Sequence, residues 1–111
     1  MKIHQQRHGA VTVLAPRGPV SGADADELKQ SLLEALRASR GRAVLDVAGI
    51  PLIDSKGLEA LVDVKQELAS AGQTLKLCGA NETLRQVLEL TDLASLFEHF
   101  EDANAAVRSF L

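Results

Sequence analysis

Three short apolar runs, separated by segments with helical periodicity, constrain the fold of this chain more than any other feature. The runs are Ala10–Ala15 (AVTVLA), Ala43–Val47 (AVLDV) and Thr74–Cys78 (TLKLC), and each has a Gly or Pro within two residues of both ends. Runs of this length with such boundaries predict β-strands. Two weaker runs, Ile3–Gln6 and Phe97–Phe100, predict strands at the edges of a sheet.

The segments between these runs repeat apolar residues every three or four positions, which is the period of an amphipathic helix. A first helix is predicted from Asp24 to Ala38, where Asp24 followed by Glu27 suggests a capping box at its start. A second is predicted from Lys56 to Ala71, ending before Gly72. Its apolar arc consists of Leu58, Leu61, Val62, Val64, Leu68 and Ala69.

Two shorter helices complete the pattern. Asn81 is placed to cap a third helix that carries Leu84, Val87 and Leu88, and Asp102 is placed to cap a fourth. The order is therefore β-β-α-β-α-β-α-(β)-α. Strands that alternate with helices after an initial hairpin predict an α/β fold, in which about four helices flank a small mixed sheet. The length of 111 residues fits one domain, residues 1–111.

Composition excludes several classes of function. A formal net charge of -3 gives no electrostatic reason to expect nucleic acid as a partner, and the absence of Trp and Tyr removes the aromatic platforms that single-stranded nucleic acids stack on. No apolar run approaches the roughly 18 residues of a membrane span, and the polar stretch Met1–Gly9 lacks the apolar core of a secretory signal. We therefore expect a cytoplasmic protein without membrane insertion.

The residues that most often hold metals or perform catalysis are sparse and scattered. His4, His8 and His99 lie in separate segments, and the single cysteine, Cys78, closes an apolar strand, so neither a metal site nor a cofactor is expected. Ser55 is not within a Gly-x-Ser-x-Gly elbow, and nothing marks a histidine as its base. We predict no catalytic residues; a small enzyme that uses Asp54 and Ser55 is the weakest alternative.

The most informative segment is Gly49–Leu58 (GIPLIDSKGL), which places an Asp-Ser pair between the exit of an apolar strand and the start of a helix. A helix N-terminus offers free backbone N–H groups and the positive end of the helix dipole, which favour a carboxylate or a phosphate. Either Asp54 or Ser55 is suited to cap the helix. Gly57 is a poor helix former in the first turn, which suggests that a side chain there would obstruct a close partner or strain the turn.

Physical chemistry alone leaves two interpretations of this segment open. In the simpler one, Asp54 and Ser55 only cap the helix and Gly57 only allows the turn. In the other, the exposed Ser55 is a site of phosphorylation, at a place where a phosphate is electrostatically favoured.

The segment resembles the motif of the bacterial STAS-domain anti-sigma factor antagonist family, an apolar strand followed by Asp-Ser-(Ser or Thr)-Gly-Leu. In that motif the Ser after the Asp accepts the phosphate. Ser55 matches the acceptor, and Asp54, Gly57 and Leu58 match its neighbours. The similarity extends over nearly the whole chain, including Gly18 before an acidic helix start, the turn at Gly72, and the segment 88–93 (LELTDL).

Three positions depart from the family pattern. Lys56 stands where the family usually has Ser or Thr, Ser21 where it usually has Asp, and Asp92 where it often has Gly. Lys56 is either an exposed first-turn lysine in a loose ion pair or a contributor to recognition of the kinase or the phosphate. Ser21 makes the surroundings of Ser55 less negative than is usual for the family.

The resemblance implies a STAS fold and a protein-binding module that is switched by phosphorylation of Ser55. The implied partners are an anti-sigma factor that is also a serine kinase of the histidine-kinase-like ATPase fold, and a serine phosphatase that resets the switch. The implied partner-binding residues surround the second helix start: Ser21, Asp24, Asp54, Ser55, Lys56, Gly57 and Glu59. The alternative within the same fold is an accessory or scaffold subunit of a lipid-transport ATPase or a stress-sensing assembly, with or without phosphorylation.

Overall fold

A computed structural model describes all residues from 1 to 111 and contains one five-stranded sheet. The strands lie in the sheet in the order in which they occur in the chain: β1 (Lys2–His8), β2 (Val11–Arg17), β3 (Ala43–Asp46), β4 (Leu75–Cys78) and β5 (Phe97–Phe100). β1 and β2 form an antiparallel hairpin, whereas β2 to β5 are parallel. The predicted mixed sheet is confirmed, and so are both of the weaker edge strands.

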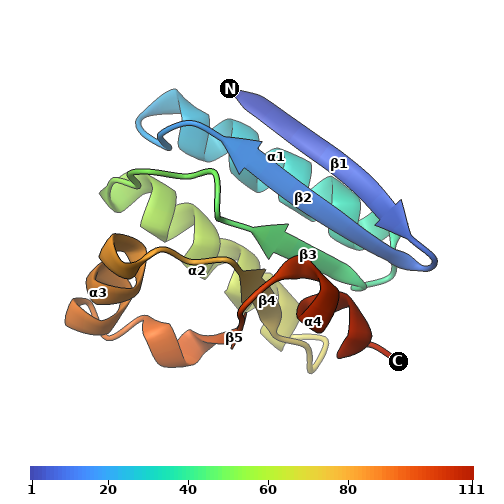
Figure 1. The fold of residues 1–111 in the computed structure, drawn as a ribbon. Coiled ribbons are helices and arrows are strands. Elements are labelled where there is room, and N and C mark those ends of the chain that lie inside the picture. Colours follow the sequence, from blue (N-terminus) through green and yellow to red (C-terminus); the bar gives the residue numbers. More distant parts are fainter.

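Four α-helices and one short 3-10 helix surround the sheet. They are α1 (Ala23–Ala38), α2 (Ser55–Ala69), α3 (Glu82–Leu90), η1 (Ala94–Leu96) and α4 (Ala103–Arg108). Figure 1 shows α1 and α2 side by side behind the sheet and α4 in front of it. The predicted element order is therefore confirmed, with boundaries that differ by at most two residues for the first two helices.

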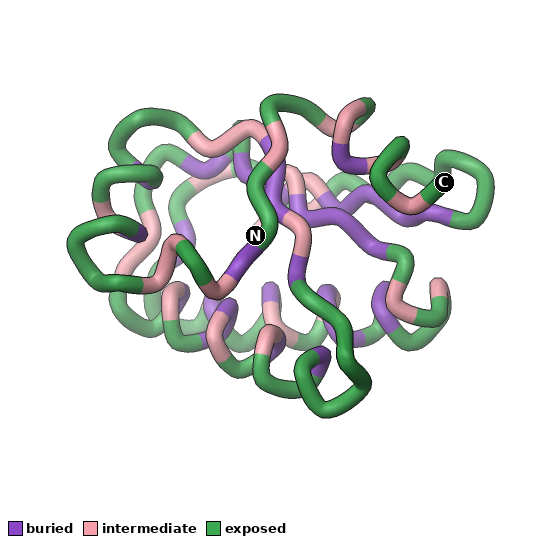
Figure 2. Tube along the Cα trace, turned by 90° about the horizontal axis from the view of Figure 1, so that it is seen from below, coloured by how far each residue is buried: buried purple, intermediate pink, exposed green.

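Residues that alternate along the strands supply two separate apolar cores. Leu14 and Leu45, which are paired in register, belong to the larger core on the side of α1 and α2. Their neighbours Val13 and Val44 are also paired and belong to the smaller core beneath α4. Figure 2 shows that the buried segments concentrate in the strands and on the inner sides of the helices. The sheet is thus covered on both faces, as parallel strands require.

Cys78 lies in the smaller core and is almost completely buried, as its place at the end of an apolar strand predicted. Burial, together with the nearby carboxyl groups of Asp46 and Asp102, raises the pKa of the Cys78 thiol to about 12. A thiol of this kind is a structural residue rather than a nucleophile.

A helix that spans a membrane requires both sufficient length and sufficient hydropathy, and no helix of the chain meets both requirements.

Two details of the predicted helices are wrong. Asp24 does not cap α1, because the chain turns at Gly22 (φ 55°) and the helix begins with no side-chain cap; Glu27 instead lies 3.7 Å from the N-terminal amine. In α2, Ala69 is exposed rather than buried, and Val62 is only half-buried. Both lie at the margin of the apolar arc, where the neighbouring elements decide which side chains are covered.

Candidate functional site

The segment that joins β3 to α2 brings the predicted functional residues to the surface at one end of the sheet. It is held against the chain before α1 by three backbone hydrogen bonds: Gly18 N–H to Gly49 O (3.0 Å), Val20 N–H to Leu52 O (2.9 Å) and Asp54 N–H to Val20 O (3.0 Å). Val20 and Ile53 form an isolated parallel bridge. The starts of α1 and α2 are therefore fixed side by side.

Asp54 is the N-cap of α2, and its carboxylate joins the two helix starts. One oxygen, Oδ1, accepts a hydrogen bond from the Gly57 N–H at 2.9 Å, and the other, Oδ2, accepts one from the Gly22 N–H at 3.0 Å. These two bonds, with smaller contributions from the Lys56 backbone N–H and its side-chain charge, outweigh partial burial and lower the pKa of Asp54 from its ordinary value of 3.8. Asp54 is therefore a fixed negative charge at neutral pH.

Ser55 is the first residue of α2 and is exposed. Its hydroxyl makes no hydrogen bond within the chain, since Asp54 and not Ser55 supplies the cap. The choice between these two caps, which the sequence left open, is thus settled in favour of Asp54. A free hydroxyl at a helix N-terminus is accessible for modification, and the helix dipole there favours an added phosphate.

Gly57 lies in the first turn of α2 and is buried against this chain's own side chains. A Cβ at this position would overlap the side chain of Ile53 and approach Cγ1 of Val20 to 3.0 Å. The sequence suggested that a side chain here would obstruct a close neighbour. The neighbours are Ile53 and Val20, so the glycine lets the loop before α2 pack closely on its first turn.

A polar groove of about 450 Å³ runs between α1 and α2 from the point where the two helices begin. Five charged side chains line it: Asp26 and Lys29 from α1, and Lys56, Glu59 and Asp63 from α2. Lys29 and Asp63 form an ion pair across it at 3.2 Å. Positive and negative groups thus share a surface that starts beside Ser55.

The structure gathers most of the predicted partner-binding residues around these two helix starts. Ser21 is exposed and directly precedes Gly22, whose N–H binds Asp54. Lys56 and Glu59 line the groove. Asp24 is half-buried in the first turn of α1 and does not line the groove, where Asp26 lies instead.

Sequence reasoning missed Leu52, whose side chain is 66% exposed three residues before Ser55. Its neighbours Ile50 and Ile53 are more buried, and the pattern of the run IPLID predicts only the exit of an apolar strand. Pro51 was the signal that could have shown this. A proline cannot donate a hydrogen bond to a strand ladder, so the residue after it need not continue a buried strand. Leu52 places an apolar side chain beside an otherwise polar surface.

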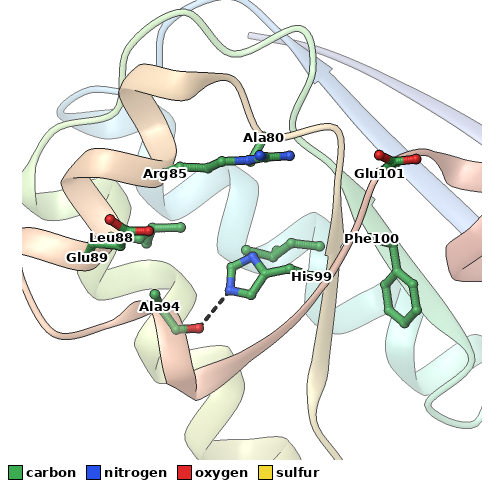
Figure 3. A pocket seen from close by; sticks show the side chains of 9 residues that line it. Ala80, Arg85, Leu88, Glu89, Ala94, His99, Phe100 and Glu101 are labelled. Atoms are coloured by element: carbon green, nitrogen blue, oxygen red, sulfur yellow. Dashed lines mark hydrogen bonds between the residues drawn. The ribbon is translucent and has the colours of Figure 1, made fainter.

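A second hollow, of about 330 Å³, lies between α3 and the strands β4 and β5 (Figure 3). Buried Leu77 and Leu88 line it together with Arg85, Glu89, His99 and Glu101. His99 Nε2 lies 2.6 Å from the carbonyl oxygen of Ala94, and His99 is exposed, as expected for an isolated histidine. Acidic and basic side chains share this hollow and none of the predicted site residues lines it, so the Ser55 region remains the candidate site.

No group of three or more His, Cys, Asp or Glu side chains is arranged to hold a metal ion. The chemistry available around Ser55 is therefore that of a free hydroxyl, a fixed carboxylate, a lysine and the N–H groups of a helix start. These groups suit recognition by another protein and modification of the hydroxyl. The Ser55 hydroxyl makes no hydrogen bond to Asp54, whose carboxylate instead accepts two backbone N–H bonds.

Comparisons with known proteins agree with this fold. BtrV of Bordetella bronchiseptica, which carries the provisional name of anti-sigma factor antagonist, is 26% identical over 110 residues, covering 99% of this chain and 95% of its own. The crystal structure of the Thermotoga maritima protein tm1081, named provisionally in the same way, superposes with a TM-score of 0.86 at 21% identity, covering 96% of this chain and 92% of that one.

The anti-sigma factor antagonist SpoIIAA of Bacillus has been solved in two forms. Its unphosphorylated form has a TM-score of 0.76 and covers 98% of this chain and 96% of its own; its phosphorylated form has a TM-score of 0.70 and covers 97% and 99%. Both are 14% identical to this chain. The sequence profile of the STAS domain matches residues 2–106, and the chain therefore belongs to the STAS domain family.

Proposed function

We propose that this chain is an anti-sigma factor antagonist, a protein that regulates transcription by binding another protein and not by catalysis. Membership of the STAS domain family supports this role, and so does the name of a relative whose similarity covers 99% of the chain. The chemistry around Ser55 is consistent with it, because exposed polar groups and one exposed apolar side chain form a surface for docking.

The proposed docking surface has two parts. One is the Ser55 loop, which is the segment that follows β3 and ends at Ser55, and the other is the end of the groove where α1 and α2 begin. Leu52 supplies an apolar contact, whereas Lys56 and Glu59 supply charges of opposite sign. Apolar side chains that become fully covered usually contribute most of the energy of an interface, and charged rim residues chiefly set its specificity. The partner of such a surface has an apolar pocket for Leu52 and complementary charges around it.

The proposed switch is phosphorylation of Ser55. The observation that carries it is the position of the Ser55 hydroxyl: exposed, without a hydrogen bond in the chain, and at the first residue of a helix in an Asp-Ser-x-Gly setting. The existence of SpoIIAA in phosphorylated and unphosphorylated forms gives a precedent within the same fold. In the unmodified state the chain binds its partner, and in the phosphorylated state it releases it.

Electrostatics explains why a phosphate would cause release. It adds about -1.5 to -2 charges at pH 7, directly beside the ionised Asp54. In a contact that excludes water, an uncompensated charge costs several kcal/mol, whereas a tenfold loss of affinity requires only about 1.4 kcal/mol. In the free protein the phosphate remains in water at the positive end of the α2 dipole with Lys56 next to it, so the fold tolerates the modification.

The partners that this mechanism requires are a serine kinase and a serine phosphatase. The kinase is proposed to be the anti-sigma factor itself, with the histidine-kinase-like ATPase fold. Docking would hold the Ser55 hydroxyl in its active site, so one contact would serve for both binding and modification. Sequestration of this factor would free a sigma factor for transcription.

The test is incubation of the pure protein with candidate kinases and labelled ATP, followed by mass spectrometry. The proposal predicts one phosphate per chain, located on Ser55, and none in Ser55→Ala. Ser95 is also exposed, makes no side-chain hydrogen bond and lies outside the proposed docking surface, so it provides the matched control. Ser95→Ala should be phosphorylated as fast as the wild type within about threefold. Phosphorylation that persists in Ser55→Ala would exclude the assignment of the site. A protein that binds its partner but accepts no phosphate would favour the accessory or scaffold role.

A further inference from the structure

A cavity of about 420 Å³ lies at the end of the sheet opposite to Ser55. It is formed where the turn between β1 and β2, the end of α1 and the start of β3 meet, on the right in Figure 1. Its polar lining consists of Gln5, Arg7, Thr12, Ser39, Arg40 and Arg42. The volume is within the range of about 300–1,000 Å³ that is typical of small-molecule pockets.

The charge of this cavity is entirely positive. Arg7, Arg40 and Arg42 line it, and no Asp or Glu does. None of the three arginines forms an ion pair, because the three ion pairs of the chain involve other groups. In a chain whose net charge is -3, three guanidinium groups without a carboxylate partner form a local concentration of uncompensated positive charge.

The backbone fixes two of these arginines on either side of Thr12. Arg7 of β1 is the register partner of Thr12 in β2, and Thr12 is in turn the register partner of Ala43 in β3. Arg42 directly precedes Ala43, and its carbonyl oxygen accepts a hydrogen bond from the Thr12 N–H at 2.9 Å. Three neighbouring strands thus hold this part of the cavity in register.

Arg40, the third arginine that lines the cavity, has an unfavourable backbone conformation. Its φ of 56° lies in the left-handed region, and the following Gly41 N–H closes the end of α1 by binding the carbonyl of Leu36 at 2.7 Å. Glycine or asparagine is the usual residue at such a helix end, because a Cβ is strained there. An arginine at this position places a third guanidinium at the cavity at some cost in backbone strain.

Thr12 is the one polar residue among the buried residues of the chain, and only 5% of its surface is exposed. Its hydroxyl makes no hydrogen bond within the chain, yet no side-chain polar atom sealed from solvent lacks a partner. The hydroxyl is therefore open to the cavity that Thr12 lines. A hydroxyl that is open to the cavity, has no partner in the chain and shares the lining with three arginines is suited to bind an acceptor oxygen.

We propose that this cavity binds a compact anion with at least two negative charges, of the class of phosphate esters and pyrophosphate. Guanidinium groups bind phosphate oxygens in a bidentate manner, and three of them match a multiply charged anion better than a single carboxylate. The negative end of the α1 dipole opposes this only weakly, because Ser39 and Gly41 already donate to its last carbonyl groups. The site is separate from Ser55 and independent of the proposed switch.

The test is a titration of the ¹⁵N-labelled protein with inorganic pyrophosphate, followed by NMR at constant ionic strength maintained with sodium chloride. The proposal predicts saturable shifts at the amides of Arg7, Thr12, Ser39 and Arg42, with little change at Ser55. Shifts that increase without saturation, or that spread equally over all arginines, would contradict it.

Two matched variants make the test specific. Arg42→Gln should weaken pyrophosphate binding by at least about tenfold, because it removes a charged donor from the cavity. Arg85→Gln, which removes an arginine that lines the hollow beside α3, should change it by less than about twofold. Circular dichroism confirms folding, and Arg7→Gln replaces Arg42→Gln if the latter unfolds. Equal effects of the two Gln variants would show nonspecific screening and overturn the proposal, whatever the outcome at Ser55.

Discussion

At the scale of single residues, one carboxylate organises the proposed docking surface. Asp54 accepts hydrogen bonds from N–H groups that begin two different helices, and Gly22, one of the two donors, is 32 positions away in the chain. The bond to Gly57 could be predicted from the sequence because a cap and its helix are local neighbours. The bond to Gly22 could not, since it depends on how α1 and α2 pack.

The hydrogen bonds of Asp54 predict a specific dependence of stability on pH. Because folding lowers its pKa, the stabilisation that they provide is complete above the ordinary value of 3.8 and is lost as the pH falls towards the lower folded-state pKa. Urea unfolding should therefore show a greater loss of stability below pH 4 in the wild type than in Asp54→Asn, which remains a good cap but does not ionise.

Asp26→Asn is the matched control for this measurement, because it removes one carboxylate near the start of α1 that makes no hydrogen bond or ion pair in the chain. It separates the effect of net charge from that of the two Asp54 bonds. Parallel stability curves for the wild type and Asp54→Asn across this pH range would contradict the assigned role.

Gly57→Ala should lower the stability of the fold, although helix propensity alone would favour alanine at this position. Alanine is favoured over glycine in a helix by about 1 kcal/mol, but a Cβ here would collide with Ile53 and Val20. Overpacking of this kind costs about 1–3 kcal/mol, so the variant should be less stable by denaturant unfolding. Glu59→Ala, exposed on the same helix, should stay within about 0.5 kcal/mol of the wild type. A stabilised Gly57→Ala would show that the loop adjusts to the added methyl group.

At the scale of elements, the sequence allows nearly all helices and strands to be predicted, because each has a local pattern. The cap of α1 is the exception. The Asp24-Glu27 spacing satisfies the capping rule, but the helix begins at Ala23, directly after the left-handed turn at Gly22, and no side chain caps it. The Gly22 N–H donates to Asp54 instead. The groove between α1 and α2 was also beyond sequence reasoning, because it depends on Asp26, Lys29 and Asp63 meeting across two elements.

The third helix is tied to the Ser55 loop through one side chain. Asn81 Oδ1 accepts a hydrogen bond from the Leu84 N–H at 2.7 Å and caps α3, while Nδ2 donates to the carbonyl of Ile50 at 3.3 Å. Loss of the cap alone typically costs about 1 kcal/mol. Asn81→Ala should therefore destabilise the fold by at least that amount and should increase amide exchange at residues 50–54, as measured by mass spectrometry.

Asp102→Ala is the matched comparison for Asn81→Ala. Asp102 caps α4 through the Ala105 N–H at 2.8 Å and is not bonded to the Ser55 loop. It should lower stability through the loss of its cap but leave exchange at residues 50–54 unchanged. Equal exchange in the two variants would show that the bond from Asn81 to Ile50 does not restrain the loop.

At the scale of the whole molecule, the parallel strands separate two surfaces. The Ser55 loop follows the carboxyl end of β3, whereas the arginine cavity lies at its amino end (Figure 1). The two-sided core between them should stay intact in the proposed phosphorylated state, because Ser55 is exposed and a phosphate on it would extend into solvent. Phosphorylation should therefore change what the surface binds without changing the fold.

The central claim, that a phosphate on Ser55 releases the partner, is tested most directly by calorimetric titration of the cognate kinase with four forms of the chain in the presence of nucleotide. The forms are the wild type, Ser55→Ala, Ser55→Asp and the Ser55-phosphorylated protein, each checked for folding by circular dichroism. We predict that Ser55→Ala binds like the wild type, that Ser55→Asp binds more weakly because it adds one charge, and that the phosphorylated form binds at least about tenfold more weakly. Equal affinities for all four forms would contradict release by charge.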